Sequence, residues 1–409
     1  MYYSTTSSCR LCKGKNLKTV IDLGAQYIQH AFIHPKKKSP LYRKFPTYLV
    51  RCANPSCGLV QLKHTVNRAI LYSIYWYRSG TNNTMISHLK GIVKEVINIT
   101  PVKKPTVLDI GCNDGTMLDM FPPTCTAYGI DPSDIALDAE KKKKIIHDFF
   151  PSPKLKNKTY DVITTIAMYY DIDNPVTFAR EVKKILSKKG IWIVEVAYLP
   201  TTLANNSYDT ICHEHLSYFH LGTLELIAQK AGLKIVKADL NNINGGSIRC
   251  YLTHASSTLY DSLDSDLEKI RSHEHTLKIN EAAIFKSFVK RVITNRNKLV
   301  QLLQKLTTEG KHIHVYGAST KGNTILQYCG IDNTFIDAAA DKNKEKWGGM
   351  TPGSQISIIS EEESRKMHPD YYLVLPWSFG EEFIKREQKL LKKGTKMIFP
   401  LPKLKIVSL

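Results

Sequence analysis

A short apolar segment that turns through two glycines does most to limit what this chain can fold into. Thr106–Ile110 is typical of a buried strand, and it continues into Gly111-Cys112-Asn113-Asp114-Gly115 and a helix over Thr116–Met120. Glycine lets the backbone pass close to a ligand, and the amino terminus of a helix adds partial positive charge. This strand, loop and helix predict the opening unit of an α/β domain with a ligand at the loop.

Further strands follow at the spacing of β-α-β units. Tyr128–Asp131 ends in an acid 20 residues after Gly111, where such a domain holds a ribose. Strands are also predicted over 144–147, 160–165 and 191–198. The glycine loop and the strand ends supply the candidates for cofactor binding, which are Asp109, Gly111, Asn113, Gly115, Asp131, Asp148 and Phe149.

The length of the chain argues for more than one domain. At 409 residues it exceeds one ordinary core, and 43% hydrophobic with 23% charged residues is typical of a folded protein. The α/β rhythm restarts at His312–Tyr316, which runs into Gly317–Asn323 and a helix through Tyr328. A glycine-containing loop with Lys321 at a helix start suits a pyrophosphate. With strands over 335–338, 371–377 and 397–400, this region predicts a second Rossmann-like domain.

Between these two domains the sequence predicts two closing strands and a helical connection. The strands, over 233–236 and 247–252, flank Asn244-Gly245-Gly246-Ser247, and adjacent glycines there allow a tight approach of the backbone to a ligand. A charged helical stretch from about Asp261 to Thr308 leads to the last domain.

Two pairs of cysteines lie near the start of the chain. Cys9 and Cys12 form one pair, and Cys52 and Cys57 form the other. Turns at these spacings present two thiolates each, so the four together can make a tetrahedral zinc site. Four thiolates leave no open position for a substrate, and a unit of about 70 residues has little core of its own, so we expect the zinc to be structural.

A segment with two histidines around a glutamate, His213-Glu214-His215, follows the strand over 191–198. A loop there would stand at the carboxyl end of a parallel sheet, where α/β enzymes keep their chemistry. If its backbone is extended, His213 and His215 point to one side and Glu214 to the other. A polar loop is the alternative, because His273-Glu274-His275 repeats the tripeptide in a polar, helical stretch. A zinc-protease motif is excluded, since its second histidine would fall at Ser217.

An aromatic segment, Tyr72–Met85, joins the cysteine unit to a helix through His88 and Val96. Its tyrosines and Trp76, followed by Arg78 and Ser79, suit a stacking and anion-binding loop. Packing between domains explains the same residues equally well.

The formal charge of +20 favours an anionic ligand such as a nucleotide. Nucleic acid is a second interpretation of this charge, but the lysines are spread over the whole chain and form no basic patch interleaved with aromatics. No apolar run approaches the length of a membrane helix, and the polar start lacks the features of a signal peptide. We therefore expect a cytoplasmic protein without a membrane or nucleic-acid partner, whose nine cysteines are metal ligands or buried thiols.

The pattern Asp-x-Gly-x-Asn-x-Gly over 109–115, with Asp131 after the second strand, resembles the cofactor loop of class I S-adenosylmethionine methyltransferases. A dinucleotide-binding domain is the alternative for this stretch. The whole chain resembles the sugar-nucleotide C-methyltransferases of deoxysugar pathways. The matching stretches are Cys9–Cys12, Cys52–Leu62, Tyr77–Gly80, Asp109–Gly115, His213–Phe219, Gly245–Arg249 and Tyr316–Thr324.

This resemblance implies an α/β protein of three parts. They are a zinc-binding module over residues 1–70, a class I methyltransferase domain of Rossmann-like fold over 71–255, and a Rossmann-like domain with a helical lead-in over 256–409. The cofactors implied are S-adenosylmethionine and a structural zinc. The reaction implied is methylation of C3 of a nucleotide-linked 4-keto-6-deoxy sugar through an enolate, with a dTDP-linked sugar as the expected substrate and a monomer as the expected state.

The resemblance also implies roles for particular residues. His215 takes the C3 proton, Glu214 orients it, and His213 or a tyrosine hydroxyl steadies the oxyanion, while Tyr75 or Tyr77 lies near the sugar. The family commonly has tyrosine where this chain has Cys212, and often histidine where it has Asn244. The residues expected to bind substrate are Arg78, Ser79, Cys212, Asn244, Arg249, Lys321 and Asn323. The alternatives are a small-molecule O- or N-methyltransferase and a zinc-ribbon RNA methyltransferase.

Overall fold

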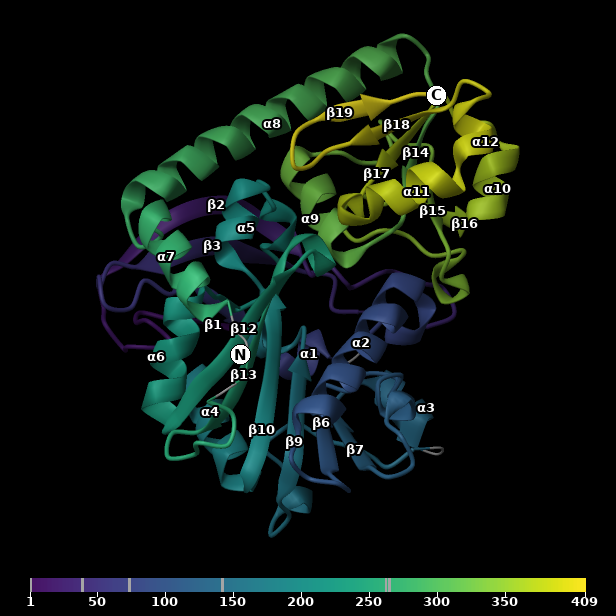
Figure 1. The fold of residues 1–409 in the computed structure, drawn as a ribbon. Helices are drawn as coiled ribbons and strands as arrows, with labels where there is room; N and C mark the ends of the chain where they lie inside the picture. The colour runs from purple at the N-terminus through teal and green to yellow at the C-terminus, as the bar shows by residue number, and fades with distance from the viewer. Residues whose placement is uncertain (1, 38–39, 73–74, 141–142, 262, 264–265) are drawn as a thin grey trace.

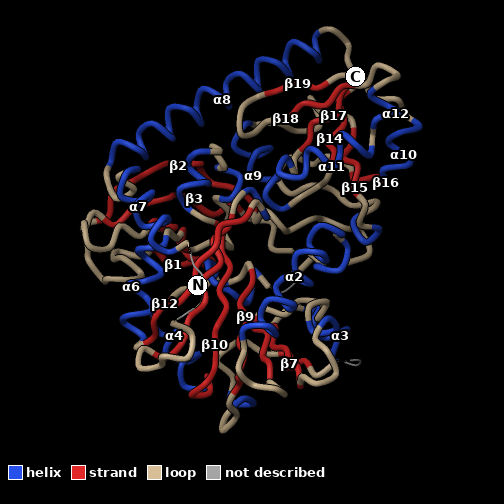
Figure 2. The backbone as a smooth tube through the Cα atoms, viewed as in Figure 1, coloured by secondary structure: helices blue, strands red, loops and turns tan. Residues whose placement is uncertain are grey.

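The computed structural model describes residues 2–37, 40–72, 75–140, 143–261, 263 and 266–409. Among these residues the strands form four sheets, of seven, six, four and two strands (Figures 1 and 2). The mixed α/β architecture expected from the sequence is confirmed.

The seven-stranded sheet is the centre of the molecule. Six of its strands run in the same direction, and β13, which pairs antiparallel with both β10 and β12, is the reversed strand. One reversed strand is thus inserted near the edge of the sheet. In spatial order the strands are β12 (Leu233–Asn241), β13 (Ser247–His254), β10 (Leu186–Ala197), β9 (Tyr160–Ile166), β6 (Thr106–Ile110), β7 (Thr126–Asp131) and β8 (Ile145–His147).

Helices cover both faces of this sheet because its strands are apolar on both sides. Along a strand, neighbouring residues point to opposite faces. Val107 and Val162 pack in one core cluster with helix α2 (Asn83–Ile99), whereas Leu108 and Ile163 pack in another with α4 (Pro175–Ile185) and α6 (Leu221–Ala231). These helices cover the faces of the sheet and leave free the edge where the strands end at their carboxyl ends and the following loops begin.

The amino-terminal part forms a four-stranded sheet, in the order β11, β4, β3, β2. Three of its strands are β2 (Leu17–Tyr27), β3 (Lys44–Cys52) and β4 (Val60–Leu62), and the two-stranded sheet joins β1 (Tyr3–Thr5) to β5 (His64–Val66). The fourth strand, β11 (Ser217–Tyr218), comes from far along the chain and pairs antiparallel with β4. The sheet of the cysteine module is thus completed by the segment that follows His213–His215.

The carboxyl-terminal part is the second Rossmann-like unit that the sequence predicts. Its sheet is parallel except for the last strand, which pairs antiparallel. In spatial order its strands are β16 (Ile358–Ser360), β15 (Ala338–Asp341), β14 (Ile313–Tyr316), β17 (Tyr371–Val374), β18 (Lys396–Phe399) and β19 (Lys405–Val407). The helices that pack around it are α8 (Ala282–Thr308), α9 (Thr320–Cys329), α10 (Glu361–Lys366), α11 (Gly380–Arg386) and α12 (Gln388–Leu391).

Several boundaries differ from the sequence-based expectation, and among them the strand expected over 371–377 ends at Val374. The helical stretch of 261–308 is two helices, α7 (Leu267–Leu277) and α8, separated by Lys278 in a left-handed conformation. The helix over 116–120 is a single 3-10 turn, Leu118–Met120. The strand predicted over 335–338 begins only at Ala338, because Phe335 and Ile336 close a turn onto Asp332.

The remaining helices are short: α1 (Arg68–Leu71), α3 (Asp134–Glu140) and α5 (Leu199–Ala204). Over the ranges that the structure describes, none of the helices combines the length and the apolar composition needed to cross a bilayer.

Candidate active site

A cavity of about 1090 Å³ lies where the three parts of the chain meet. Its walls come from the loops after β6 and β7, the aromatic segment, the His-Glu-His loop, and the loop after β14. The structure brings most of the predicted site residues into this lining: Tyr75, Tyr77, Arg78, Ser79, Asp109, Gly111, Asn113, Asp131, Phe149, Glu214, His215, Asn244 and Lys321.

The glycine loop after β6 and the acid after β7 line the cavity. Gly111 has φ +79°, and a Cβ there would lie 2.8 Å from Cγ of Met168. Asp131 accepts hydrogen bonds from the backbone N–H of Asn113 at 2.9 Å and from that of Ser133 at 2.8 Å. The side chain of Asp109 accepts from the Thr164 hydroxyl, and burial raises its pKa to about 7. These groups fit a nucleoside cofactor, with Asp131 at the position that binds a ribose.

Two residues predicted for the cofactor lie outside the cavity lining. Gly115 has φ +69°, and a Cβ there would meet the side chains of Lys143 and Ile145, so its glycine is required by packing against β8. Asp148 caps its own turn, accepting from the N–H of Phe149 at 2.8 Å and from the Ser152 hydroxyl at 2.7 Å.

The described part of the aromatic segment bridges two walls of the cavity. The backbone N–H of Ser79 donates to Oδ1 of Asn113, and Nδ2 of Asn113 donates to the carbonyl of Tyr77. On the other side, Arg78 lies 3.0 Å from Glu345 of the carboxyl-terminal part, in an ion pair. The segment therefore does both things that the sequence left open, lining the cavity and packing between domains; Ser73 and Ile74 lie outside the described residues.

His215 has the geometry of a proton acceptor. Its Nδ1 lies 2.8 Å from the carbonyl oxygen of Thr210. Because a carbonyl only accepts, Nδ1 carries the proton and Nε2 carries the lone pair. Burial and the nearby Lys321 ammonium lower the pKa of His215 to about 4, against the opposing influence of Glu214, so the ring is neutral at pH 7. The orienting partner is thus the Thr210 carbonyl, where the sequence suggested Glu214.

Glu214 is buried beside the cavity, and its ion-pair partner is His30 of the cysteine module. Oε1 of Glu214 lies 2.8 Å from Nδ1 of His30, as an ion pair rather than an aligned hydrogen bond. Burial alone would raise the pKa of Glu214, and the charge of His30 more than offsets it, so that pKa lies below its ordinary value. Glu214 is therefore a carboxylate.

His213 faces away from the cavity, into the sheet of the cysteine module. The loop turns at His213 and Glu214 rather than running extended, so the two histidines do not share a side. Nδ1 of His213 lies 2.9 Å from Oε1 of Gln29, and Nε2 lies 3.1 Å from the Thr47 hydroxyl. Burial lowers its pKa to about 4. The neighbouring Cys212 is fully buried and does not line the cavity.

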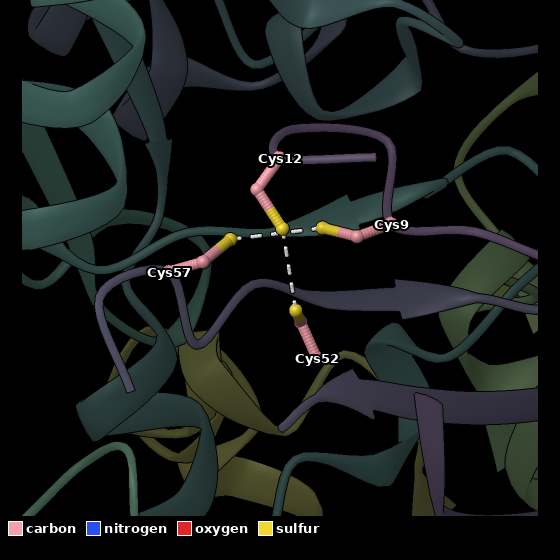
Figure 3. Close-up of side chains that lie close together, drawn as sticks. All are labelled: Cys9, Cys12, Cys52 and Cys57. Carbon is pink, nitrogen blue, oxygen red and sulfur yellow. Dashed lines mark hydrogen bonds between the residues drawn. The ribbon is translucent and has the colours of Figure 1, made fainter. Parts of the chain in front are cut away.

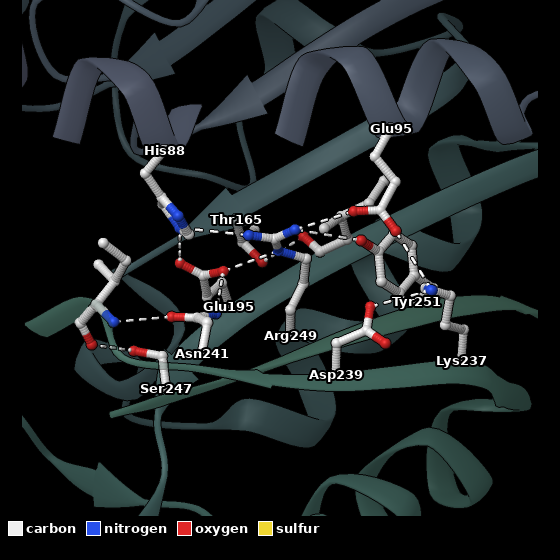
Figure 4. A network of polar contacts seen from close by, with 12 residues as sticks. His88, Glu95, Thr165, Glu195, Lys237, Asp239, Asn241, Ser247, Arg249 and Tyr251 are labelled. Carbon is white, nitrogen blue, oxygen red and sulfur yellow. Dashed lines mark hydrogen bonds and ion pairs between the residues drawn. The ribbon is translucent and has the colours of Figure 1, made fainter. Parts of the chain in front are cut away.

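Besides Cys212, two more residues predicted to contact substrate are held elsewhere. Asn323 is fully buried and donates to the carbonyl of Gln29 at 2.7 Å. Arg249 lies beneath α2 in a polar network (Figure 4), where it donates to Glu195 at 2.8 Å and to Glu95 at 3.0 Å. The guanidinium of Arg249 offsets the charge of Glu195, which is 2% exposed. Neither Asn323 nor Arg249 lines the cavity.

The four amino-terminal cysteines converge on one point (Figure 3). Their sulfur atoms all lie within 4.8 Å of one another, with Cys9 and Cys57 at 3.6 Å and Cys12 and Cys52 at 3.5 Å. A tetrahedron with Zn–S bonds of about 2.3 Å has sulfurs about 3.8 Å apart, so the cluster fits a zinc ion. With four sulfur ligands the metal would be closed to substrate.

Two residues of the site carry no sequence motif that would have revealed them. His30 belongs to a connection between β2 and β3, and only the fold places it against Glu214. Tyr170 follows β9, and its ring centroid lies 4.3 Å from that of His215. The second tripeptide is structural: Glu274 is buried and accepts hydrogen bonds from Tyr198 and from the N–H groups of Leu221 and Gly222.

The sheet topology, the glycine loop and the acid after β7 define a class I methyltransferase that uses S-adenosylmethionine. Three family models match the chain in succession: a zinc binding domain over residues 9–72, a methyltransferase domain over 85–238 and a C-methyltransferase C-terminal domain over 242–402. The chain belongs to the C-methyltransferase family that its motifs indicated.

Similarities to individual proteins cover different shares of the chain. The C-methyltransferase NovU of Streptomyces niveus is 27% identical over 413 residues, which cover 98% of this chain and 96% of NovU. Among solved structures, the plantazolicin methyltransferase BpumL in complex with SAH has a TM-score of 0.36 at 17% identity, covering 42% of this chain and 86% of BpumL. An S-adenosylmethionine-dependent methyltransferase from Clostridium acetobutylicum has a TM-score of 0.35 at 14% identity, and the match covers 43% of this chain and 93% of the Clostridium chain.

Proposed function

We propose that this enzyme transfers a methyl group to C3 of a nucleotide-linked 4-keto-6-deoxy sugar, with a dTDP-linked sugar as its substrate. The observation that carries the proposal is His215, a neutral imidazole in the cavity wall whose protonated nitrogen is tied to the Thr210 carbonyl. An O- or N-methyltransferase has no need of a base that removes a proton from carbon. NovU is itself described as a C-methyltransferase, which supports the same reaction class.

In the proposed reaction His215 removes the C3 proton. The C3–H bond breaks, its electron pair moves towards the C4 carbonyl, and the proton goes to Nε2 of His215. The Glu214 carboxylate raises the pKa of His215 and therefore stabilises the imidazolium as it forms. Bound S-adenosylmethionine supplies the methyl group.

The cavity also provides groups that suit the developing enolate oxygen. Lys321 lines the cavity and lies near enough to His215 to lower its pKa, so its ammonium can stabilise negative charge there. The hydroxyls of Tyr75 and Tyr170 are further candidates, since both residues line the cavity. His213 is not among them, because its ring is bonded to Gln29 and Thr47.

The residues proposed for the methyl donor and for the nucleotide lie on different walls. Asp109, Gly111, Asn113 and Asp131 surround the donor site after β6 and β7. The loop after β14, at the amino terminus of α9, would take the phosphates of the sugar nucleotide, since helix amino termini favour anions. The remaining residues proposed to contact the sugar nucleotide are Arg78, Ser79 and Asn244.

Product NMR tests the proposal directly. The enzyme is incubated with S-adenosylmethionine and several nucleotide-linked keto sugars, and a new methyl singlet on a quaternary ring carbon is expected. Without the donor, but with a demethylated donor analogue, the C3 hydrogen should exchange with deuterated water. The variant His215→Ala should lose this exchange and lower turnover by roughly 10²- to 10⁴-fold, the usual contribution of a positioned base.

A matched control is available in the second His-Glu-His tripeptide, His273-Glu274-His275. His275 is exposed on α7, so His275→Ala should leave turnover unchanged. An O-methyl resonance in the product, or full activity of His215→Ala, contradicts the proposed reaction. Tight RNA binding that weakens steeply with salt would instead favour an RNA methyltransferase.

A further inference from the structure

The imidazole of His30 lies between two hydrogen-bond acceptors. It is 3% exposed and belongs to the connection between β2 and β3. Its Nε2 lies 2.6 Å from the carbonyl oxygen of Leu71, and its Nδ1 lies 2.8 Å from Oε1 of Glu214. Both ring nitrogens thus lie close to an oxygen atom.

This arrangement determines the charge of the ring. The Leu71 carbonyl requires a proton on Nε2. Nδ1 lies 2.8 Å from a carboxylate oxygen in an ion pair that is not an aligned hydrogen bond. At this distance the negative charge of Glu214 favours a positive ring over a neutral one, so Nδ1 carries a proton as well. Burial disfavours this charge, but Glu214 outweighs burial, and the pKa of His30 lies above its ordinary value. The site therefore holds a buried imidazolium–carboxylate pair.

We propose that His30 is a positioning residue, an imidazolium from the cysteine module that keeps Glu214 ionised. The ionised Glu214 can then stabilise the proton taken up by His215. This inference rests on the proposed function. The cysteine module thereby takes part in the chemistry through the side chain of His30, in addition to any role in stability.

The pair has defined electrostatic surroundings. From the His-Glu-His loop, His213, His215 and Cys212 face it; from the segment after α1, Tyr72 and Tyr75; and from the turn after β9, Tyr170 and Asp171. Asp171 is the other acid, and burial together with the charge of Glu214 raises its pKa. Of the described groups named here, His30 is therefore the cation that balances the negative charge at Glu214.

Nitrogen-15 NMR of the free enzyme tests the charge of His30 without any substrate. The ring is assigned by the signals lost in His30→Gln, and both of its nitrogens should carry protons at pH 6 and keep them to a higher pH than those of an ordinary histidine. In Glu214→Gln the second proton should be lost at neutral pH, because burial then acts without the carboxylate. A neutral His30 ring in the wild type overturns the proposal, and so does an imidazolium that persists in Glu214→Gln.

Kinetics test the route through Glu214. His30→Gln should lower kcat by roughly 10²-fold, the lower end of what a positioned acid–base group contributes, and should shift the acid limb of the kcat profile to higher pH. KM for the sugar nucleotide should change little. The double variant with Glu214→Gln should lose no more activity than Glu214→Gln alone. Additive losses, or an unshifted acid limb, overturn the proposal.

His34→Gln is the matched control, since His34 lies on the same connection and bonds the carbonyl of Trp347. It should keep the kcat profile of the wild type. If no keto sugar yields a C-methyl product with the wild type, the proposed function fails, whereas the NMR experiment still decides the state of His30.

Discussion

Replacing His213 with glutamine should remove a defined part of the pH dependence of stability. His213 is 1% exposed, and burial lowers its pKa to about 4, against an ordinary value of 6.5. Between these two values the unfolded chain binds the proton and the folded one does not, so stability falls as pH falls. For one such histidine the loss between pH 7 and pH 5 is about 2 kcal/mol.

The measurement is equilibrium unfolding in urea at both pH values, for the wild type and for His213→Gln. The free energy of unfolding should fall by about 2 kcal/mol less in the variant than in the wild type. Groups distant from His213 cancel in this comparison. His30, whose raised pKa acts in the opposite direction and whose charge also acts on His213, is present in both proteins. The control is His312→Gln, which should keep the pH dependence of the wild type because the side chain of His312 is 72% exposed.

An equal pH dependence in His213→Gln and wild type would refute the burial argument. The same variant also tests the placement of His213 outside the reaction. Glutamine can still bond Gln29 or Thr47, and His213→Gln should therefore retain deuterium exchange at C3. Loss of exchange in a folded variant would return His213 to the role of oxyanion stabiliser.

Three more outcomes are expected. Metal analysis should find one zinc per chain, and Cys12→Ser should loosen the module while calorimetry shows donor binding largely unchanged; freshly purified protein without zinc contradicts this. Asp131→Ala should weaken donor binding by roughly 1 to 3 kcal/mol, the cost of leaving buried donors unpaired, and an unchanged affinity counts against the cofactor site. Arg249→Met should lower the free energy of unfolding by roughly 1 to 3 kcal/mol, because it removes the guanidinium from the buried Glu195, which keeps its contacts with His88 and Asn241. A raised KM for the sugar nucleotide with normal stability would instead place Arg249 at the substrate.

The sequence was most informative where local chemistry is repeated in a recognisable order. The strand, glycine loop and acid at Asp131 predicted the central sheet, and the cysteine spacing predicted a cluster that the fold brings within 4.8 Å. Both depend on short-range rules of strand, turn and ligand geometry. The boundaries proposed at residues 70 and 255 stay predictions.

What the sequence did not reveal depends on contacts between distant parts of the chain. His30 and Glu214 are separated by more than 180 residues, and no periodicity relates them. Arg249 was expected at the ligand because it belongs to the stretch Gly245–Arg249 that resembles the family, but on β13 its side chain alternates to the face beneath α2. The side to which a residue points is set by packing, and packing is not visible in a motif.

The pairing of β11 with β4 bears on the order in which the chain can fold. Ser217 meets Gln61 across more than 150 residues, so the sheet of the first module lacks its edge strand until the methyltransferase part has been made. Contacts of such long range are slow to form, and an unpaired edge is exposed to aggregation meanwhile. A fragment ending near residue 70 would retain its cysteines but present the open edge of β4 permanently. Zinc bound early in synthesis would stabilise the part of the sheet near the cysteines. Its edge strand, β11, is supplied later by the segment that follows His215.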